Sequence, residues 1–161
     1  FGKTHVISAG AEDAHPVLVL HGSASSAAGC WPLINGLSSK YRVYAPDAPR
    51  HLGKTEPFRL STKNNDYRKW LEDVLNHLEI KHANVVGFSF GGWMACKLAM
   101  HAPERIDKIV LLSPIGLAPF RAQNWIRAPL FLLITLIFRT DASIESVLLL
   151  IVLEYPQVSH L

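Results

Sequence analysis

Cysteine is scarce in this sequence, with only Cys30 and Cys96 among 161 residues. Two cysteines cannot build a framework of disulfide bridges, and these two lack the close spacing of metal ligands. We therefore expect reduced thiols, no metal site and a cytoplasmic protein. Neither thiol is expected to be catalytic, because Cys96 lies among small and apolar residues, where a buried thiol is inert.

The chain also lacks a basic run and an apolar run long enough to cross a membrane. Its formal charge is +3, but lysine and arginine are scattered along the chain, so nucleic acid is not an expected partner. The apolar segment 130–138 is shorter than the about 20 residues that span a bilayer, and Arg139 and Asp141 follow it. No stable membrane insertion is therefore expected, and neither a signal peptide nor an internal repeat is visible.

The composition is that of a compact globular protein, with 49% hydrophobic and 18% charged residues, and a single domain over 1–161 is expected. Near-continuous apolar runs alternate with helical patterns. This alternation predicts an α/β fold in which helices cover both faces of a mostly parallel sheet. Runs of β-branched residues and leucine predict strands at 4–8, 16–22, 41–47, 83–89 and 107–114.

Two helices are expected between these strands. Apolar residues recur at helical spacing over 70–78, and Asn65 or Asp66 is placed to cap the start of this helix. The second helix is predicted over 90–101, directly after the strand at 83–89.

The strand predicted at 83–89 runs without a linker into the pentapeptide Gly87-Phe88-Ser89-Phe90-Gly91. A strand-to-helix turn tight enough to expose one side chain forces that residue into a sparsely populated backbone region. Side chains at Gly87 and Gly91 would collide across such a turn. Ser89 would then stand at a helix N-terminus, where N–H groups stabilise developing negative charge. The pattern predicts a nucleophile elbow, and its place between a strand and a helix distinguishes it from a chance match in a loop.

A second feature ends the strand predicted at 16–22, the tripeptide His21-Gly22-Ser23. The oxyanion of a tetrahedral intermediate needs two preorganised donors, one from the residue after the nucleophile and one from a loop after a neighbouring strand. The N–H groups of Phe90 and Ser23 fit these roles, and Gly22 lets the backbone come close. His21 is expected to tie down the loop rather than to act as the base, since the base in this architecture comes late in the chain.

The chain carries, in this order, the segments VLVLHGSASSAAGCWP, YRVYAPDAPRHLGKTEP and VVGFSFGGWMACKLAMHAPERIDKIVLLSP. Together they resemble the successive central strands and loops of the α/β-hydrolase superfamily, in its carboxylesterase-like branch, over roughly residues 4–120. In one departure from the relatives' common Asp-x-Pro-Gly-x-Gly-x-Ser, Arg50 and His51 replace small residues near the entrance of the site. The resemblance places Asp47 in a loop that braces the site, so we interpret Asp47 as structural.

The resemblance also implies a catalytic triad in the order serine, acid, histidine, in which the histidine takes the serine proton and the acid orients the histidine. Only His101 and His160 follow Ser89. His101 ends the predicted helix about 18 Å along its axis from Ser89, so it is too distant to serve. His160 is the remaining candidate, because IVLEYPQVSHL resembles the family's last strand and histidine loop, with Ser159 in place of the usual glycine.

Three residues are candidates for the acid of the triad. Asp141 is favoured, following a strand built from 130–137, and Glu145 and Glu154 are weaker alternatives. The same stretch also resembles the helical cap that relatives insert after the sixth strand, so 115–150 is a possible cap segment. Relatives are longer than this chain, so either segments are missing before the last strand or the chain is a truncated product.

These residues predict a serine hydrolase that cleaves a small or medium acyl ester through an acyl-enzyme, without a metal or an organic cofactor. The expected partner is a small-molecule acyl substrate, and the oligomeric state is left open. Serine members of the superfamily also cleave thioesters, lactones and carbon–carbon bonds, which the sequence does not separate. The alternative is a non-catalytic hydrolase-like binding module or a truncated inactive fragment.

Overall fold

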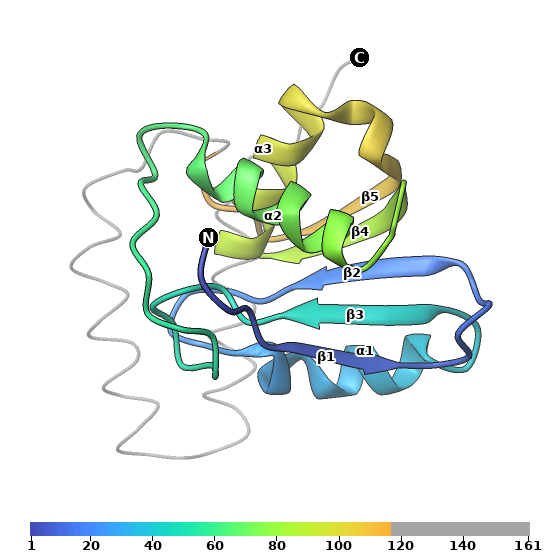
Figure 1. Cartoon of the computed structure of the whole chain (residues 1–161). Coiled ribbons are helices and arrows are strands. Elements are labelled where there is room, and N and C mark those ends of the chain that lie inside the picture. Colours follow the sequence, from blue (N-terminus) through green and yellow to red (C-terminus); the bar gives the residue numbers. More distant parts are fainter. Residues whose placement is uncertain (117–161) are drawn as a thin grey trace, which may run out of the picture. The chain divides into compact units, whose positions relative to one another are not determined.

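The computed structural model describes residues 1–116, in which five strands form one sheet (Figure 1). Their order across the sheet is β1-β3-β2-β4-β5. β1 pairs antiparallel with β3, and the other neighbouring strands pair in parallel. The strands are β1 (Val6–Ala9), β2 (Pro16–Leu20), β3 (Arg42–Pro46), β4 (Ala83–Phe88) and β5 (Ile106–Leu112).

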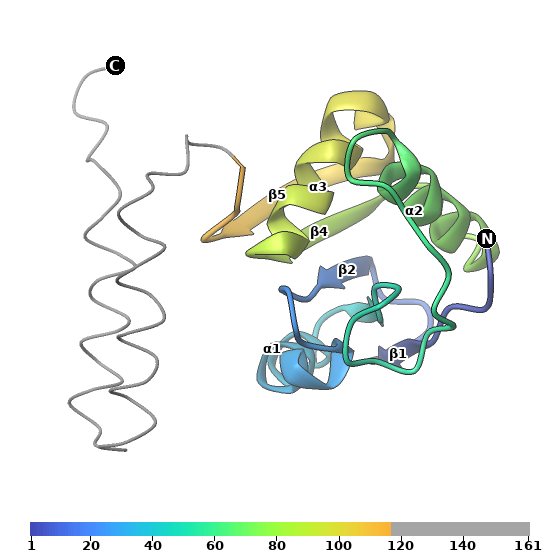
Figure 2. The ribbon, with the colours of Figure 1, turned by 90° about the vertical axis from the view of Figure 1, so that its left-hand side faces the viewer.

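Helices in this part of the chain cover both faces of the sheet. One face carries α1 (Trp31–Leu37), which follows the short 3₁₀ helix η1 (Ala27–Cys30). The opposite face carries α2 (Asp66–His77) and α3 (Phe90–His101), as Figures 1 and 2 show. A second 3₁₀ turn, η2 (Pro103–Arg105), leads from α3 into β5.

Strand β2 separates two hydrophobic cores. Val17 and Val19 belong to the core beneath α1, whereas Leu18 and Leu20 belong to the core beneath α2 and α3. All four side chains are at most 2% exposed. A strand that is buried on both faces needs apolar residues at every position, and this explains why β2 reads as an unbroken apolar run.

The predicted fold class is confirmed, because a mostly parallel sheet with helices on both faces is present. All five predicted strands occur, and the helix predicted over 90–101 is α3. Helix α1 was not predicted, since Pro32 and Gly36 within its seven residues are typical of loops. Pro32 lies in the first turn, where its missing N–H costs no helical bond, and the fully buried Ile34 fixes the helix on the sheet.

The start of α2 corrects one detail of the sequence analysis. Asn65 occupies the N-cap position, but its side chain makes no capping hydrogen bond. Asp66 instead accepts a hydrogen bond from the Ser61 N–H at 2.9 Å, which stabilises the turn before the helix. The start of α2 is therefore held through the loop that precedes it.

Strand β5 is an edge strand of the sheet within residues 1–116. Its side chains Ile109, Val110 and Leu112 are 39%, 49% and 42% exposed. The segment 151–161, which resembles the family's last strand and histidine loop, lies outside the described residues.

The predicted cap also lies outside the described residues from 117 onward. Contacts divide the chain into two units, Phe1–Leu117 and Ala118–Leu161, and the single domain over 1–161 stays a prediction. Over residues 1–116, every helix is too short or too polar to cross a membrane.

Candidate active site

Ser89 lies between the end of β4 and the start of α3, at the N-cap position of the helix. Its backbone has φ 51° and ψ −110°, a region that residues other than glycine rarely adopt. A conformation of this kind costs of order 1–3 kcal/mol and persists only where the surroundings impose it. The side chain is half-buried. The structure therefore gives Ser89 the strained turn that the pentapeptide predicted.

Backbone hydrogen bonds hold this turn in place. The Ser89 N–H donates to the carbonyl oxygen of Leu112 at 2.9 Å. The Ser89 carbonyl oxygen accepts from the N–H of Trp93 and from that of Ile115, both at 3.2 Å. The end of β5 and the first turn of α3 thus fix the strained backbone from two sides.

The two glycines of the pentapeptide lie where no side chain fits. A Cβ atom at Gly87 would lie 2.5 Å from the carbonyl oxygen of Gly91, and one at Gly91 would collide with the carbonyl oxygen of Leu20. The first turn of α3 therefore crosses the ends of β4 and β2 in backbone contact. This close approach is the physical reason for a glycine on each side of Ser89.

The tripeptide His21-Gly22-Ser23, which follows β2, lies next to the turn that carries Ser89. A Cβ atom at Gly22 would lie 2.9 Å from the Phe88 ring and 3.4 Å from the Ser89 Cβ. Ser23 is exposed, and its N–H has no hydrogen-bond partner among residues 1–116. As the first residue of α3, Phe90 has an N–H without an acceptor inside the helix. The structure thus brings Gly22 beside the elbow that carries Ser89 and Phe90, while the oxyanion roles of Ser23 and Phe90 stay predictions.

His21 is fully buried, and both of its ring nitrogens are engaged. Nδ1 donates to the carbonyl oxygen of Gly22 at 2.7 Å, and Nε2 accepts from the Ala48 N–H at 2.9 Å. A carbonyl oxygen can only accept and an amide N–H can only donate, so the ring is neutral with its proton on Nδ1. This arrangement favours the predicted structural role of His21 over that of a base.

Asp47 ties together three segments around the site. Its carboxylate is 2% exposed and accepts from the Ala27 N–H at 2.6 Å, the Lys54 N–H at 2.8 Å and His5 Nδ1 at 2.8 Å. Burial alone would raise the pKa of Asp47, but these donors outweigh it and the pKa is lowered below its ordinary value. The bracing role interpreted from the sequence is therefore visible as hydrogen bonds.

Aromatic rings surround the start of α3, and sequence reasoning missed this cluster. Phe90 stacks on Trp93 with ring centroids 5.1 Å apart, and both rings meet Tyr67 of α2 edge to face at 5.2 and 5.5 Å. The spacing of Phe90 and Trp93, three residues apart on one helix, was the signal available in the sequence. The cluster packs α2 against the start of α3.

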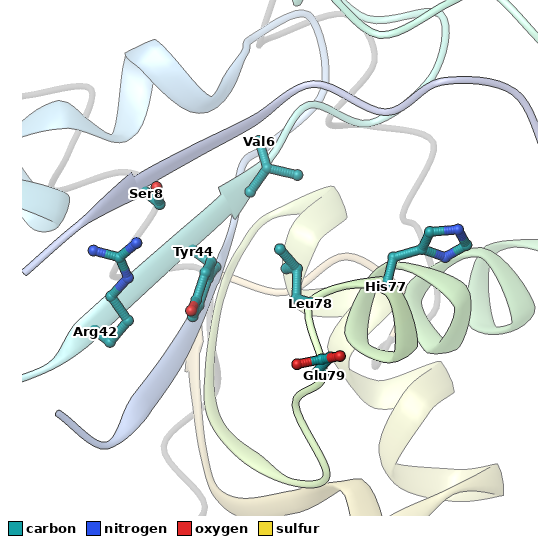
Figure 3. Close-up of a pocket in the computed structure, with 7 residues that line it drawn as sticks. All are labelled: Val6, Ser8, Arg42, Tyr44, His77, Leu78 and Glu79. Atoms are coloured by element: carbon teal, nitrogen blue, oxygen red, sulfur yellow. The ribbon is translucent and has the colours of Figure 1, made fainter. Parts of the chain in front are cut away.

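Two cavities of the described residues lie away from Ser89. The first, of about 360 Å³, opens between β1, β3 and the end of α2 (Figure 3). The second, of about 520 Å³, adjoins it, since both are lined by Val6, His77 and Leu78. None of the lining residues belongs to the elbow or to the tripeptide after β2. The two cavities therefore have no part in chemistry at Ser89.

Of the other candidates for the base and the acid, only His101 lies within the described residues. His160, Asp141, Glu145 and Glu154 lie outside the described residues, so their roles stay predictions. His101 ends α3, the helix whose start carries Ser89, and its Nδ1 contacts the Lys97 carbonyl oxygen at 3.1 Å. No cluster of three or more potential metal ligands occurs over residues 1–116. Cys30 and Cys96 are free thiols there, and burial raises the pKa of each.

The family profile described as alpha/beta hydrolase fold matches residues 15–134. The chain belongs to this family. The profile contains the elbow, the tripeptide after β2 and the Asp47 loop. The α/β-hydrolase fold thus accounts for the strand order and for the elbow between β4 and α3.

Named relatives of this α/β hydrolase include esterases. It is 40% identical over 114 residues to the uncharacterized carboxylesterase nap of Bacillus subtilis, a match that covers 71% of this chain and 38% of the relative. It is 36% identical over 109 residues to 2-hydroxymuconate semialdehyde hydrolase of a Pseudomonas species, over 64% of this chain and 38% of the relative. The crystal structure of naproxen esterase (carboxylesterase NP) from Bacillus subtilis matches with a TM-score of 0.74 and 38% identity, over 81% of this chain and 46% of that one. The chain therefore spans less than half the length of these relatives.

The Asp47 contacts generate a first prediction. Asp47→Asn should lower the free energy of unfolding by about 1–3 kcal/mol, because the amide NH₂ would face N–H donors in a buried place. Denaturant unfolding at neutral pH measures the change. Asp107→Asn is the matched control, since Asp107 also accepts from histidine, here His15 and His82, but is exposed. Equal losses in the two variants would contradict the bracing role.

The lowered pKa of Asp47 fixes the sign of a pH effect. Its ionised form is stabilised in the folded state, so this contribution is present above the ordinary carboxyl pKa of about 3.9 and is lost as pH falls through the folded pKa. Asp47→Asn should therefore show a flatter decline in stability below about pH 4 than the unmodified chain.

Proposed function

We propose that this chain is the nucleophile-bearing part of a serine hydrolase that cleaves a small or medium acyl ester through an acyl-enzyme. The observation that carries the proposal is the strained, half-buried Ser89 at the N-terminus of α3, next to Gly22. A serine held in this way at the end of a central parallel strand is placed to attack a carbonyl carbon.

In the proposed reaction the Ser89 hydroxyl attacks the ester carbonyl and loses its proton to a histidine. The N–H groups of Ser23 and Phe90 then stabilise the oxyanion, and the alcohol leaves with the proton. Water releases the acid from the acyl-enzyme in a second, equivalent step. We assign the base to His160 and the acid that orients it to Asp141. No step requires a metal or an organic cofactor.

The carboxylesterase relatives support an ester as the substrate class, and the hydrolase of a hydroxymuconate semialdehyde keeps carbon–carbon cleavage as a related alternative. The free thiols agree with the proposed cytoplasmic location.

A second candidate function is a non-catalytic binding module or an inactive fragment. It is favoured by one observation, that the chain covers only 38–46% of the length of its named relatives. An activated serine separates the two candidates, because only a serine with a working base reacts rapidly with a fluorophosphonate.

Ser89→Ala should abolish both fluorophosphonate labelling and hydrolysis of a short-chain p-nitrophenyl ester, because it removes the nucleophile. In a serine protease the equivalent change costs about a millionfold in kcat. Ser113→Ala is the matched control, since Ser113 directly follows β5 and also has a positive φ, of 46°. Turnover above about a tenth of the unmodified rate in Ser89→Ala would remove the assignment.

The oxyanion loop should act through backbone donors. Gly22→Val should lower kcat severely, because its side chain would collide with Phe88 and push the loop away from Ser89, and loss of one oxyanion donor costs roughly 2.7–4 kcal/mol. Ser23→Ala should have little effect, because only the backbone of Ser23 is used. Steady-state kinetics on the p-nitrophenyl ester measure both, and equally small effects would count against this loop.

A further inference from the structure

His51 lies in the loop after β3 and contacts both elements that carry the proposed oxyanion donors. Its ring meets the His21 ring edge on, with centroids 5.5 Å apart. It also lies over the Phe90 ring, with centroids 5.2 Å apart and planes 31° apart. One side chain thus bridges the end of β2 and the start of α3.

Hydrogen bonds join the same loop to the residues after Ser23. His51 Nδ1 accepts from the Ala24 N–H at 3.3 Å. The Leu52 N–H donates to the Ser25 carbonyl oxygen at 3.1 Å. The segments 24–25 and 51–52 are therefore linked by one side-chain and one backbone bond, and only the first depends on the identity of residue 51.

The backbone around Ser23 needs such support. Ala24 has φ 50°, a conformation that is unfavourable for alanine and persists only when neighbours impose it. Before Ser23, the Gly22 carbonyl oxygen is held by His21; after Ser23, the Ala24 N–H is held by His51. Ser23 itself makes no bond among the described residues that would fix its N–H. Its orientation is therefore set by its two neighbours and the histidines that bind them.

We propose that His51 is a positioning residue of the oxyanion hole, whose neutral ring holds Ala24 and so directs the Ser23 N–H toward the substrate oxygen. The inference rests on the proposed function of Ser89.

The contact works only with a neutral ring. Nδ1 must carry a lone pair to accept from the Ala24 N–H, so the proton sits on Nε2. In a protonated ring Nδ1 would also carry a hydrogen, which would face the Ala24 N–H, so this hydrogen bond would be lost. Burial lowers the pKa of His51, which favours the neutral ring that this hydrogen bond needs.

The titratable and charged groups around His51 come from three elements. His21 ends β2, Tyr67 of α2 contacts the same Phe90 ring, and Asp47 and Arg50 belong to the loop of His51 itself. The Asp47 carboxylate is bound to Ala27, Lys54 and His5, and no carboxylate contacts the His51 ring within residues 1–116. Nothing in this part of the chain therefore stabilises a protonated His51.

Two substitutions of His51 test its hydrogen bond to the Ala24 N–H. His51→Gln keeps a side-chain acceptor but does not titrate, and His51→Leu removes the acceptor. In the full chain, His51→Leu should lower kcat about ten- to a hundredfold with little change in KM, whereas His51→Gln should retain most of kcat. His101→Leu, at the far end of α3, is the matched control and should leave both parameters unchanged.

The dependence of kcat on pH distinguishes a positioning role of His51 from a merely structural one. In the unmodified chain kcat should fall below about pH 6.5 in two proton-linked steps, one from the catalytic base and one from His51. His51→Gln should remove one step, because the glutamine cannot be protonated there. Two unchanged steps in His51→Gln, or equal kcat in His51→Leu and the unmodified chain, would overturn the proposal.

An NMR titration tests the contact without reference to hydrolysis. In the full chain carrying Ser89→Ala, the Ala24 amide signal should shift with pH at the pKa of His51, and the shift should vanish when His51→Gln is added. An Ala24 signal that ignores the titration of His51 would overturn the positioning role. Hydrolysis that persists in Ser89→Ala would instead overturn the proposed function, so the two failures are distinguishable.

Discussion

Backbone contact between the first turn of α3 and the end of β2 is the constraint on which the rest of the site depends. Gly91 approaches the Leu20 carbonyl oxygen so closely that no side chain fits between them. This contact sets the direction of α3, the strained turn at Ser89 and the distance between Ser89 and Gly22. It also presses the apolar side of α3 onto the core that contains Leu18. The same close contact therefore determines both how α3 packs on the sheet and where Ser89 lies.

Around this contact, beyond the ends of the strands, buried polar side chains hold the loops together. The loops after β2 and β3 contain few backbone bonds of their own, and buried side chains join them instead. Asp47 accepts three hydrogen bonds from three separate segments, and His21 links Gly22 to Ala48. Buried polar groups of this kind fix a single arrangement, because any other would leave a donor or an acceptor without a partner. The carboxyl ends of the strands thus gain rigidity that the loop sequences alone would not give.

The sequence predicted the structure correctly where a local pattern is compatible with only one conformation. An apolar run that is buried on both faces predicted β2, and the two glycines around Ser89 predicted the elbow because only glycine fits there. It was uninformative where the outcome depends on residues far apart. Helix α1 forms because Ile34 finds a buried place on the sheet, and His51 meets Ala24 across 27 positions of sequence. The proposed base and acid, His160 and Asp141, belong to this second class, because both are far from Ser89 in the sequence.

The edge formed by β5 has a consequence for handling the protein. Beyond Asp107 and Lys108 the strand reads Ile-Val-Leu-Leu, with high β-propensity and no charge, and three of these four side chains are exposed within the described part. Such an edge offers backbone N–H and C=O groups beside apolar side chains, which is the template on which strands of other molecules add. A shortened form ending near residue 116 would therefore be prone to aggregate, and a charged side chain at Val110 would be the simplest protection.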